Sequence, residues 1–455
     1  MEKGASGTGG LERRLGLFPL TNIVVANMVG AGIFTTSGLL IRDLGDPVIL
    51  LALWIVGGII ALCGALAYGE LGSAIPRAGG EYAILSELYH PMLGFMSGWT
   101  SFFVGFSAPI AASAIGFAEY LSRAFPVLFR IGLLPEGIEA AVLKKAWACL
   151  AILLFTLIHA RGIVFGAKVQ NLLTVAKVAL IAALVVGGLL AGRGDWVHFA
   201  QGTPFRFDFA GAKSAGLALM WIMFAYSGWN ASAYIGSEVK NPSRNLPRSL
   251  LLGTGIVILL YAGLNVLFLY AASPAQMSGV VAVGALAAGN LFGPSFERLL
   301  SILISFALFS SLSAFIILGP RVYYSMARDG CFFRSFGRVH PVFGAPSKAV
   351  VLQGAISMVI AVSGSFDQIL TYLGFSLGLF PLLAVMGVFK IRKRGMGEFR
   401  MPGFPAAPLI YVLTGIPILI LGFLHSPGPS GVAILTVAAA VPAYALIRRR
   451  ERRES

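Results

Sequence analysis

The stretch from Leu17 to Leu40 reads LFPLTNIVVANMVGAGIFTTSGLL and carries no charged residue. Its 24 residues are enough to span a bilayer as an α-helix. Gly30 and Gly32 flank Ala31 in the middle of it, and each glycine costs about 1 kcal/mol in a helix interior relative to alanine. Backbone unwound at this depth persists only where it is buried in protein or lines a cavity. The stretch therefore indicates either a helix interrupted at a ligand site or a small-residue face that packs against another helix.

The composition of the whole chain indicates a helical membrane protein. Apolar residues make up 57% of the 455 residues and charged residues 12%, and the mean hydropathy is +0.84. Soluble domains contain about 25% charged residues. The apolar runs are continuous rather than alternating, which favours membrane helices over a β-barrel. The net charge of +15 would suggest a nucleic acid partner in a soluble protein, but basic cytoplasmic loops explain it better here.

We predict twelve membrane helices, and the distribution of Lys and Arg predicts their orientation. With the N-terminus in the cytoplasm, 24 of the 34 basic residues face the cytoplasm, 9 face outward, and Lys177 lies within the membrane. We therefore expect a multi-pass protein of the cell membrane with both termini in the cytoplasm. The basic tail, residues 448–455, indicates a stop-transfer flank or a contact with anionic membrane lipid. The predicted helices cover residues 17–41, 47–75, 93–124, 141–160, 163–191, 213–238, 247–272, 297–326, 348–364, 367–390, 406–424 and 430–447.

A second interrupted helix is predicted at residues 213–238, where Ser227-Gly228-Trp229-Asn230 breaks an apolar run. Each interruption lies in the first helix of a possible five-helix unit, and such a pair indicates the binding site of an inverted-repeat transporter. An odd number of helices gives two consecutive units opposite topology in the membrane. The expected organisation is a cytoplasmic tail (1–16), a first repeat (17–191), a second repeat (213–390), two further helices (406–447) and the basic tail.

The two interruptions predict a site for a zwitterion. Free amides at Gly30, Ala31 and Gly32 lie at the positive end of a helix dipole and suit a carboxylate. Free carbonyls near Met28, and from Phe224 to Ser227, suit an ammonium. An α-amino acid carries both groups close together. No charged residue is near either interruption in the sequence, which favours neutral amino acids over obligately charged ones.

Three further residues are candidates for roles around this site. Lys177 lies about 20 Å along the helix that begins near residue 163, at about 1.5 Å per residue. Because intramembrane charges are costly and mark functional sites, it is a candidate proton carrier or a fixed cation facing the first interruption, with a structural lysine as the alternative. Phe224 is a candidate lid over the site, although aromatic residues in membrane helices are more often packing residues. Glu238 is a candidate inner gate that pairs with a loop arginine.

The sequence contains no motif placed for catalysis or metal binding. We find no HExxH, Walker or GxSxG pattern where such chemistry can operate. The three cysteines, Cys63, Cys149 and Cys331, have neither metal nor disulfide spacing. We therefore expect a transporter without a cofactor rather than an enzyme. A channel that uses the same interruptions as a filter is the remaining alternative.

These motifs resemble those of the amino acid–polyamine–organocation superfamily, and of its L-type amino acid transporter group in particular. The resemblance covers nearly the whole ten-helix core. The matching segments are VGAGIF (29–34), GALAYGELGSAIPRAGGEYAIL (64–85), VQNLLTVAKVAL (169–180), FAYSGWN (224–230), SEVKNPSRNLPRSL (237–250) and RVYYSMARDG (321–330).

The resemblance implies an all-α, leucine-transporter-type fold in which the first and sixth helices are unwound. The carboxylate of an amino acid would meet the amides of residues 30–32, and the ammonium would meet carbonyls of Met28, Phe224 and Ser227. Phe224 aligns with the aromatic gate of the family, and Asn230 aligns with a polar residue that steadies the sixth helix. Lys177 aligns with a residue that takes the place of a sodium ion.

The expected activity is sodium-independent exchange of neutral L-amino acids by alternating access. Proton-coupled uptake, with Lys177 as the titrating group, is the alternative.

Two departures from the family pattern bear on this expectation. Many L-type members carry Ser or Thr where this chain has Ala31, so one hydroxyl donor is missing. Eukaryotic members bind a heavy subunit through a cysteine between the third and fourth helices, and residues 125–140 contain none. We therefore expect a free-standing, prokaryotic transporter without a disulfide-linked partner.

Overall fold

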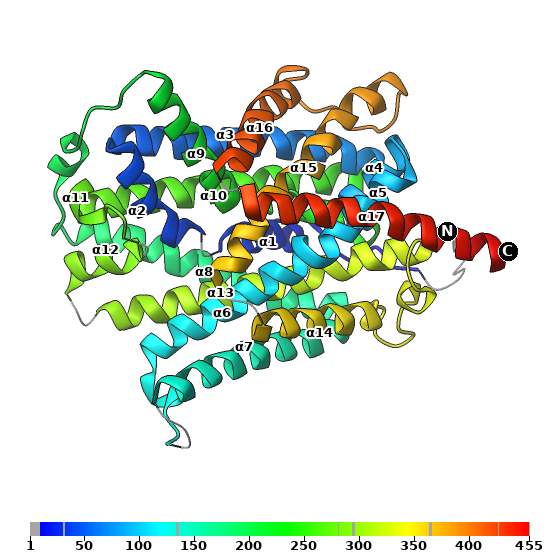
Figure 1. The fold of residues 1–455 in the computed structure, drawn as a ribbon, viewed down its shortest axis with the longest axis horizontal. Coiled ribbons are helices and arrows are strands. Elements are labelled where there is room, and N and C mark those ends of the chain that lie inside the picture. The colour runs from blue at the N-terminus through cyan, green and yellow to red at the C-terminus, as the bar shows by residue number, and fades with distance from the viewer. Residues whose placement is uncertain are drawn as a thin grey trace.

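The computed structural model describes residues 10–30, 32–132, 136–280, 282–293, 296–363, 366–425 and 427–454. Helices make up most of these ranges, and two isolated bridges are the strand-like features within them (Figure 1). Eight helices of the described ranges are long and apolar enough to cross a membrane, and a bent pair supplies a ninth crossing. The prediction of an all-α, multi-pass membrane protein is confirmed.

The first half of the chain forms the first five predicted spans. The first span is broken into two helices, and the third contains a π-helical segment, η1. A short helix that was not predicted, α4, lies in the connection between the second and third spans. The elements are α1 (Leu17–Met28), α2 (Gly32–Leu44), α3 (Pro47–Ala74), α4 (Glu81–Leu88), α5 (Pro91–Thr100), η1 (Ser101–Ser107), α6 (Ala108–Ala124), α7 (Glu136–Ala160) and α8 (Ile163–Leu190).

The second half forms the remaining spans, with the short helices α11 and α12 in a connection where no helix was predicted. The last helix continues through Glu454, and its apolar part, Ser430–Ile447, matches the membrane helix predicted at 430–447. The Arg and Glu residues beyond this part are strong helix formers. The elements are α9 (Phe209–Ala225), η4 (Ala231–Tyr234), η5 (Gly236–Glu238), α10 (Pro242–Ala271), α11 (Pro274–Met277), α12 (Val283–Phe292), α13 (Phe296–Arg328), α14 (Ser347–Ser363), α15 (Phe366–Lys393), α16 (Ala406–His425) and α17 (Pro427–Glu454).

Helix α1 lies at the centre of the bundle (Figure 1), where it packs against α8, α10 and α13. Eight of its 12 residues are buried, including Asn22 and Asn27. A helix that is apolar on all sides belongs in such a core. Around it, α3 packs along α10, and α6 packs along α13. The interruption that follows α1 is therefore enclosed by protein, which is the condition for unwound backbone at membrane depth.

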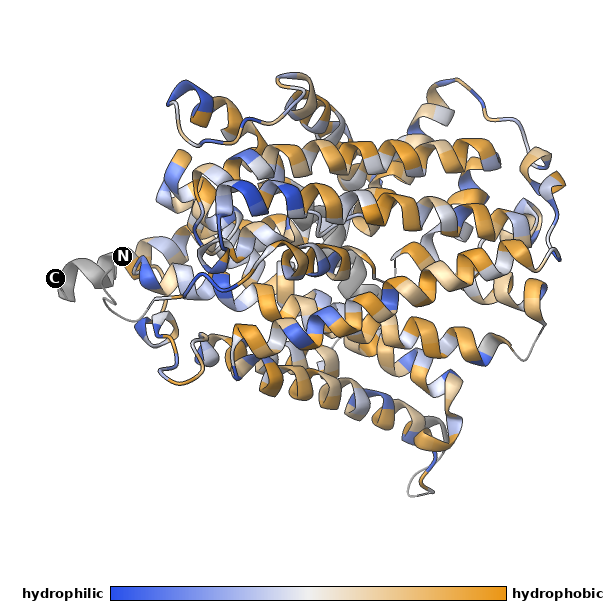
Figure 2. Ribbon diagram, turned by 180° about the vertical axis from the view of Figure 1, so that it is seen from behind, coloured by the Kyte–Doolittle hydropathy of each residue, from blue (hydrophilic) through white to orange (hydrophobic). Residues whose placement is uncertain are grey.

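The labels of the two chain ends lie at the same end of the molecule in Figure 1. Figure 2 shows long hydrophobic runs along the helices and a concentration of hydrophilic residues toward that same end. This distribution agrees with an even number of crossings, and with the uneven sorting of Lys and Arg in the sequence.

Candidate functional site

The first interruption separates α1 from α2, whose axes differ by 41°. The two glycines that bound it have different surroundings. A Cβ atom on Gly32 would lie 2.9 Å from Cβ and 3.0 Å from Cα of Ala225, so only glycine lets α2 approach the end of α9 this closely. A Cβ atom on Gly30 would meet no atom within 4 Å, because this residue borders open space. Ala31, the third predicted residue here, lies outside the described residues.

The second interruption begins where α9 ends at Ala225, and the α-helix does not resume. Turns occupy residues 226–230, followed by the 3₁₀ segments η4 and η5. The prediction of a helix from 213 to 238 is therefore wrong in its second half. Gly228 adopts φ of +99°, a conformation outside the helical range. A Cβ atom on it would lie 3.0 Å from the carbonyl carbon and oxygen of Asn27, so the two interruptions touch.

Replacing Gly228 by alanine is expected to lower the stability of the protein by about 1–3 kcal/mol, the usual cost of forcing a side chain into a disfavoured backbone region. The contact with Asn27 adds to that cost. Thermal unfolding in detergent measures the effect. Gly255→Ala on α10 is the matched control, because its Cβ would meet no atom within 4 Å. Equal melting temperatures for the two variants would contradict the close contact.

A cavity of about 440 Å³ lies between the two interruptions. This size falls in the range of small-molecule sites. The structure brings together at its wall all the predicted substrate-binding residues that it describes. They are Met28, Gly30, Gly32, Phe224, Ser227 and Asn230.

The third span supplies a polar wall of the cavity that sequence reasoning missed. Ser97 and Thr100 of α5 line it, together with Ser101 and Gly105 of η1 and Ser113 of α6. π-Helical turns are rare and occur frequently at functional sites. The hydroxyl residues in this otherwise apolar stretch could have indicated a polar wall. Their spacing in the sequence does not indicate a π-helical turn.

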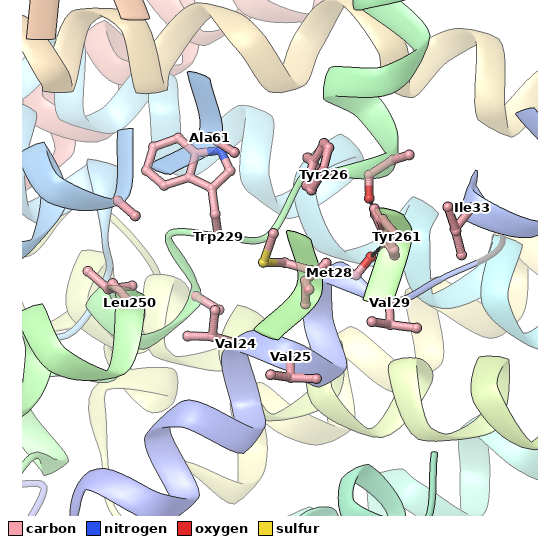
Figure 3. Close-up of a cluster of buried hydrophobic side chains, with 14 of the residues drawn as sticks. Val24, Val25, Met28, Val29, Ile33, Ala61, Tyr226, Trp229, Leu250 and Tyr261 are labelled. Carbon is pink, nitrogen blue, oxygen red and sulfur yellow. Dashed lines mark hydrogen bonds between the residues drawn. The ribbon is translucent and has the colours of Figure 1, made fainter. Parts of the chain in front are cut away.

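Two of the carbonyls predicted to meet an ammonium, those of Met28 and Phe224, already have protein partners. The Tyr261 hydroxyl lies 2.7 Å from the carbonyl oxygen of Met28 and 3.0 Å from that of Ala225, and Figure 3 shows this tyrosine beside Met28. The carbonyl oxygen of Phe224 accepts the amide of Ser227 at 3.0 Å. A carbonyl oxygen has two lone pairs, so those of Met28 and Ala225 can each accept one further donor, whereas that of Phe224 also accepts the Tyr226 amide.

Lys177 lies behind the first interruption, and its side chain is 1% exposed. Its Nζ atom donates to the carbonyl oxygens of Val29 at 2.9 Å and Ala26 at 3.3 Å, and to the Ser311 hydroxyl at 3.0 Å. The same hydroxyl donates to Val29 at 2.6 Å. The ammonium therefore ties α8 and α13 to the carbonyl end of α1, where a helix dipole favours a cation.

Glu238 does not line the described cavity but lies in a buried ion pair. Its carboxylate accepts from Nε of Arg321 at 2.8 Å and from Nη2 at 3.3 Å. Arg321 belongs to α13, so the prediction of a loop arginine is wrong. The backbone carbonyl of Glu238 accepts the amides of Arg14 and Leu15, both at 2.9 Å. The pair thus joins η5, α13 and the segment before α1 at the end of the molecule that holds both termini.

Glu81, the first residue of α4, is a cavity residue that sequence reasoning missed. Its Oε1 atom accepts the Tyr68 hydroxyl at 2.6 Å and the Asn230 amide at 2.5 Å. No charged residue is near either interruption in the sequence, but the fold brings this carboxyl group beside the second one. Glu81 and Asn230 are 149 residues apart in the sequence, and only the fold brings them together.

Comparison with known proteins relates the whole chain to amino acid transporters. Residues 15–445 match a family model described as amino acid permease. The chain is 30% identical to the serine/threonine exchanger SteT of Bacillus subtilis, over 97% of this chain and 98% of the relative. It is 27% identical to the b(0,+)-type amino acid transporter 1 of Mus musculus, over 92% and 84%. It is 26% identical to the large neutral amino acids transporter small subunit 2 of Homo sapiens, over 98% and 82%.

Proposed function

The chain belongs to the amino acid permease family, and on that premise we propose that it exchanges neutral L-amino acids across the cell membrane without sodium. Family membership makes it a membrane transporter of amino acids rather than an enzyme. The observation that carries the proposal is the cavity of about 440 Å³ that residues of both helix interruptions line. Exchange is the activity named for the relative in Bacillus subtilis, and neutral substrates are named for the human relative.

In the proposed complex the substrate carboxylate meets the amides of residues 30–32, at the N-terminal end of α2. A helix N-terminus favours an anion. The substrate ammonium meets carbonyl oxygens of Met28, Phe224 and Ser227, and that of Met28 can accept a further donor beside the Tyr261 hydroxyl. Phe224 closes the cavity on the outer side as an aromatic gate, and Asn230 steadies the second interruption. Support for this arrangement comes from the described residues of the set, all of which line the same cavity.

We propose that Lys177 acts as a fixed cation in place of a bound sodium ion. The three hydrogen bonds of its Nζ atom to α1 and α13 support that role. A proton carrier would need contact with the cavity or with water during the cycle. If uptake is coupled to protons and Lys177 is the titrating group, Lys177 is a proton carrier and not a fixed cation.

We propose that residues 17–191 and 213–390 form two inverted repeats, followed by helices at 406–447 and a basic tail at 448–455. The packing of α3 along α10, and of α6 along α13, supports this division because these helices hold equivalent positions in the two repeats. Both termini then lie in the cytoplasm, where the basic tail can contact anionic lipid. No disulfide-linked heavy subunit is expected, because residues 125–140 contain no cysteine.

Uptake into liposomes tests the proposed function. Purified protein is reconstituted into liposomes that are empty or loaded with an unlabelled amino acid, and a panel of labelled amino acids is offered outside without sodium. Exchange predicts rapid uptake only into loaded liposomes. Uptake driven by a pH difference into empty liposomes would indicate proton symport. A single-channel conductance, without acceleration by substrate on the opposite side, would indicate a channel.

A bulky residue at position 30 is expected to abolish substrate binding, because its side chain would occupy the open space beside the first interruption. Gly30→Leu should lower affinity by at least about tenfold, corresponding to about 1.4 kcal/mol. Gly30→Ala is the matched control, since a Cβ atom there meets no atom within 4 Å. Unchanged affinity in the leucine variant would remove the first interruption from the site.

A further inference from the structure

Helix α7 presents an exposed apolar face that ends in a basic residue. Leu150, Leu154 and Leu157 recur along it at the i, i+4 and i+7 spacing of one helix face, and each is about half exposed. Arg161 follows four residues later, in the turn after the helix, and it is exposed as well. Such a face suits the hydrocarbon of a bilayer along the leucines and the headgroup region at the arginine.

Helix α14 presents the same arrangement in the opposite chain direction. Lys348, near its start, is exposed, and the exposed residues Val351, Val359 and Val362 continue its face at helical spacing. Helix α14 packs along α7, and the two helices lie together at the lower edge of the bundle in Figure 1. Their exposed faces therefore belong to the outer surface of the bundle, where a membrane protein meets lipid.

The backbones that carry the two basic residues are in contact. The Ser347 hydroxyl donates to the carbonyl oxygen of Ala160 at 2.7 Å. Lys348 and Arg161 each directly follow a residue of this hydrogen bond. The start of α14 and the end of α7 lie at the end of the molecule that holds both termini (Figure 1). Two cations thus meet at one end of the apolar seam between the helices.

No carboxylate balances this charge in the part of the chain that the structure describes. Neither Arg161 nor Lys348 forms an ion pair there. The sequence contains no Asp or Glu from 140 to 194 or from 330 to 366, so the flanking segments offer none either. Unpaired cations at a membrane surface attract anionic headgroups. The ligand chemistry that fits this place is an anion joined to an apolar chain.

We propose that an anionic phospholipid binds here, with its phosphate between Arg161 and Lys348 and an acyl chain along the exposed faces of α7 and α14. The lipid belongs to the leaflet at the end of the molecule that holds both termini. A zwitterionic phospholipid fits less well, because the cation of its headgroup meets two further cations. The site is separate from the substrate cavity and from the basic tail at 448–455, so it does not depend on the proposed function.

Lipid titrations test the inference. The purified full chain in detergent is titrated with dioleoylphosphatidylglycerol, which is anionic, or with dioleoylphosphatidylcholine, which has the same acyl chains and no net charge. Bound lipid is counted by native mass spectrometry. The wild type should bind the anionic lipid at least about tenfold more tightly, since each basic residue at the headgroup contributes about fivefold. Inorganic phosphate should displace it no better than chloride at the same ionic strength, because phosphate lacks the apolar chain. Equal affinity for the two lipids, or specific displacement by phosphate, would overturn the inference.

Replacing the two basic residues locates the site. Arg161→Gln with Lys348→Gln should weaken the binding of phosphatidylglycerol about fivefold for each residue replaced, with phosphatidylcholine within about twofold. If this double variant does not fold, Lys348→Gln alone, with an expected loss of about fivefold, takes its place. The control is Arg328→Gln with Arg338→Gln, which removes the same charge from exposed positions at the buried last turns of α13, away from the seam. Equal weakening in the two double variants, or unchanged binding in the first, would overturn the inference.

Discussion

Replacing Lys177 by alanine is expected to abolish exchange and to lower the stability of the protein. The substitution removes three hydrogen bonds, to Ala26, Val29 and Ser311. It leaves the buried carbonyl oxygen of Ala26 without its lysine donor, at a cost of about 1–3 kcal/mol for an unsatisfied group, while Val29 keeps the Ser311 hydroxyl. It also releases α1 from α8 and α13, so the interruption loses the geometry that the substrate requires. Exchange in loaded liposomes and thermal unfolding in detergent measure the two effects.

Lys168→Ala is the matched control, because this lysine lies on the same helix, α8, and is exposed. It should retain exchange and the wild-type melting temperature. The pH dependence of the remaining exchange activity distinguishes the two roles proposed for Lys177, a fixed cation and a proton carrier. A fixed cation predicts that exchange is lost at every pH. Exchange that persists in Lys177→Ala but no longer depends on pH would identify Lys177 as the proton carrier.

The fold was predictable to the level of individual spans because the bilayer imposes a length and a composition on each helix. The predicted helix at 348–364 corresponds to α14 (Ser347–Ser363), and the one at 163–191 corresponds to α8 (Ile163–Leu190). The interruption at Gly30 was predictable for the same reason, since glycine is costly inside a helix. These features depend on the local sequence alone.

The second half of the sixth span was not predictable by that reasoning. Residues 231–238 directly continue the predicted sixth span, and nothing in their sequence requires the 3₁₀ segments η4 and η5. Tertiary contacts determine the backbone conformation of residues 231–238. The positive φ of Gly228 and its contact with Asn27 redirect the chain, and the backbone carbonyl of Glu238 pairs with Arg14 and Leu15. Such contacts join residues too far apart in sequence for a local pattern to show.

Glu81 was missed for a related reason. In the sequence it belongs to a loop between two spans, and its acidic side chain suggests exposure to water. In the structure the loop folds inward as α4, and the carboxylate reaches the second interruption through Asn230. Predicting each membrane span from its own sequence does not show where the loops between the spans lie relative to the cavity.

Breaking the ion pair between Glu238 and Arg321 is expected to have the second large effect. Both side chains are at most 1% exposed. Glu238→Ala leaves the Arg321 guanidinium buried without its carboxylate, at a cost of about 3–5 kcal/mol. The same change frees η5 from α13, which loosens the end of the molecule that holds both termini. The expected results are a lower melting temperature and slower exchange.

A double variant distinguishes the effect of an unpaired buried charge on stability from the role of the ion pair as a gate. Replacing both Glu238 and Arg321 by methionine removes the unpaired charge, and substituting a buried pair by apolar residues is often neutral or stabilising. Stability should therefore return toward that of the wild type, while exchange stays impaired if the pair acts as a gate. Arg77→Met is the control, because its pair with Asp329 is part-exposed and such pairs contribute about 0–1 kcal/mol. Full recovery of exchange in the double variant would reduce the Glu238–Arg321 pair to a structural contact.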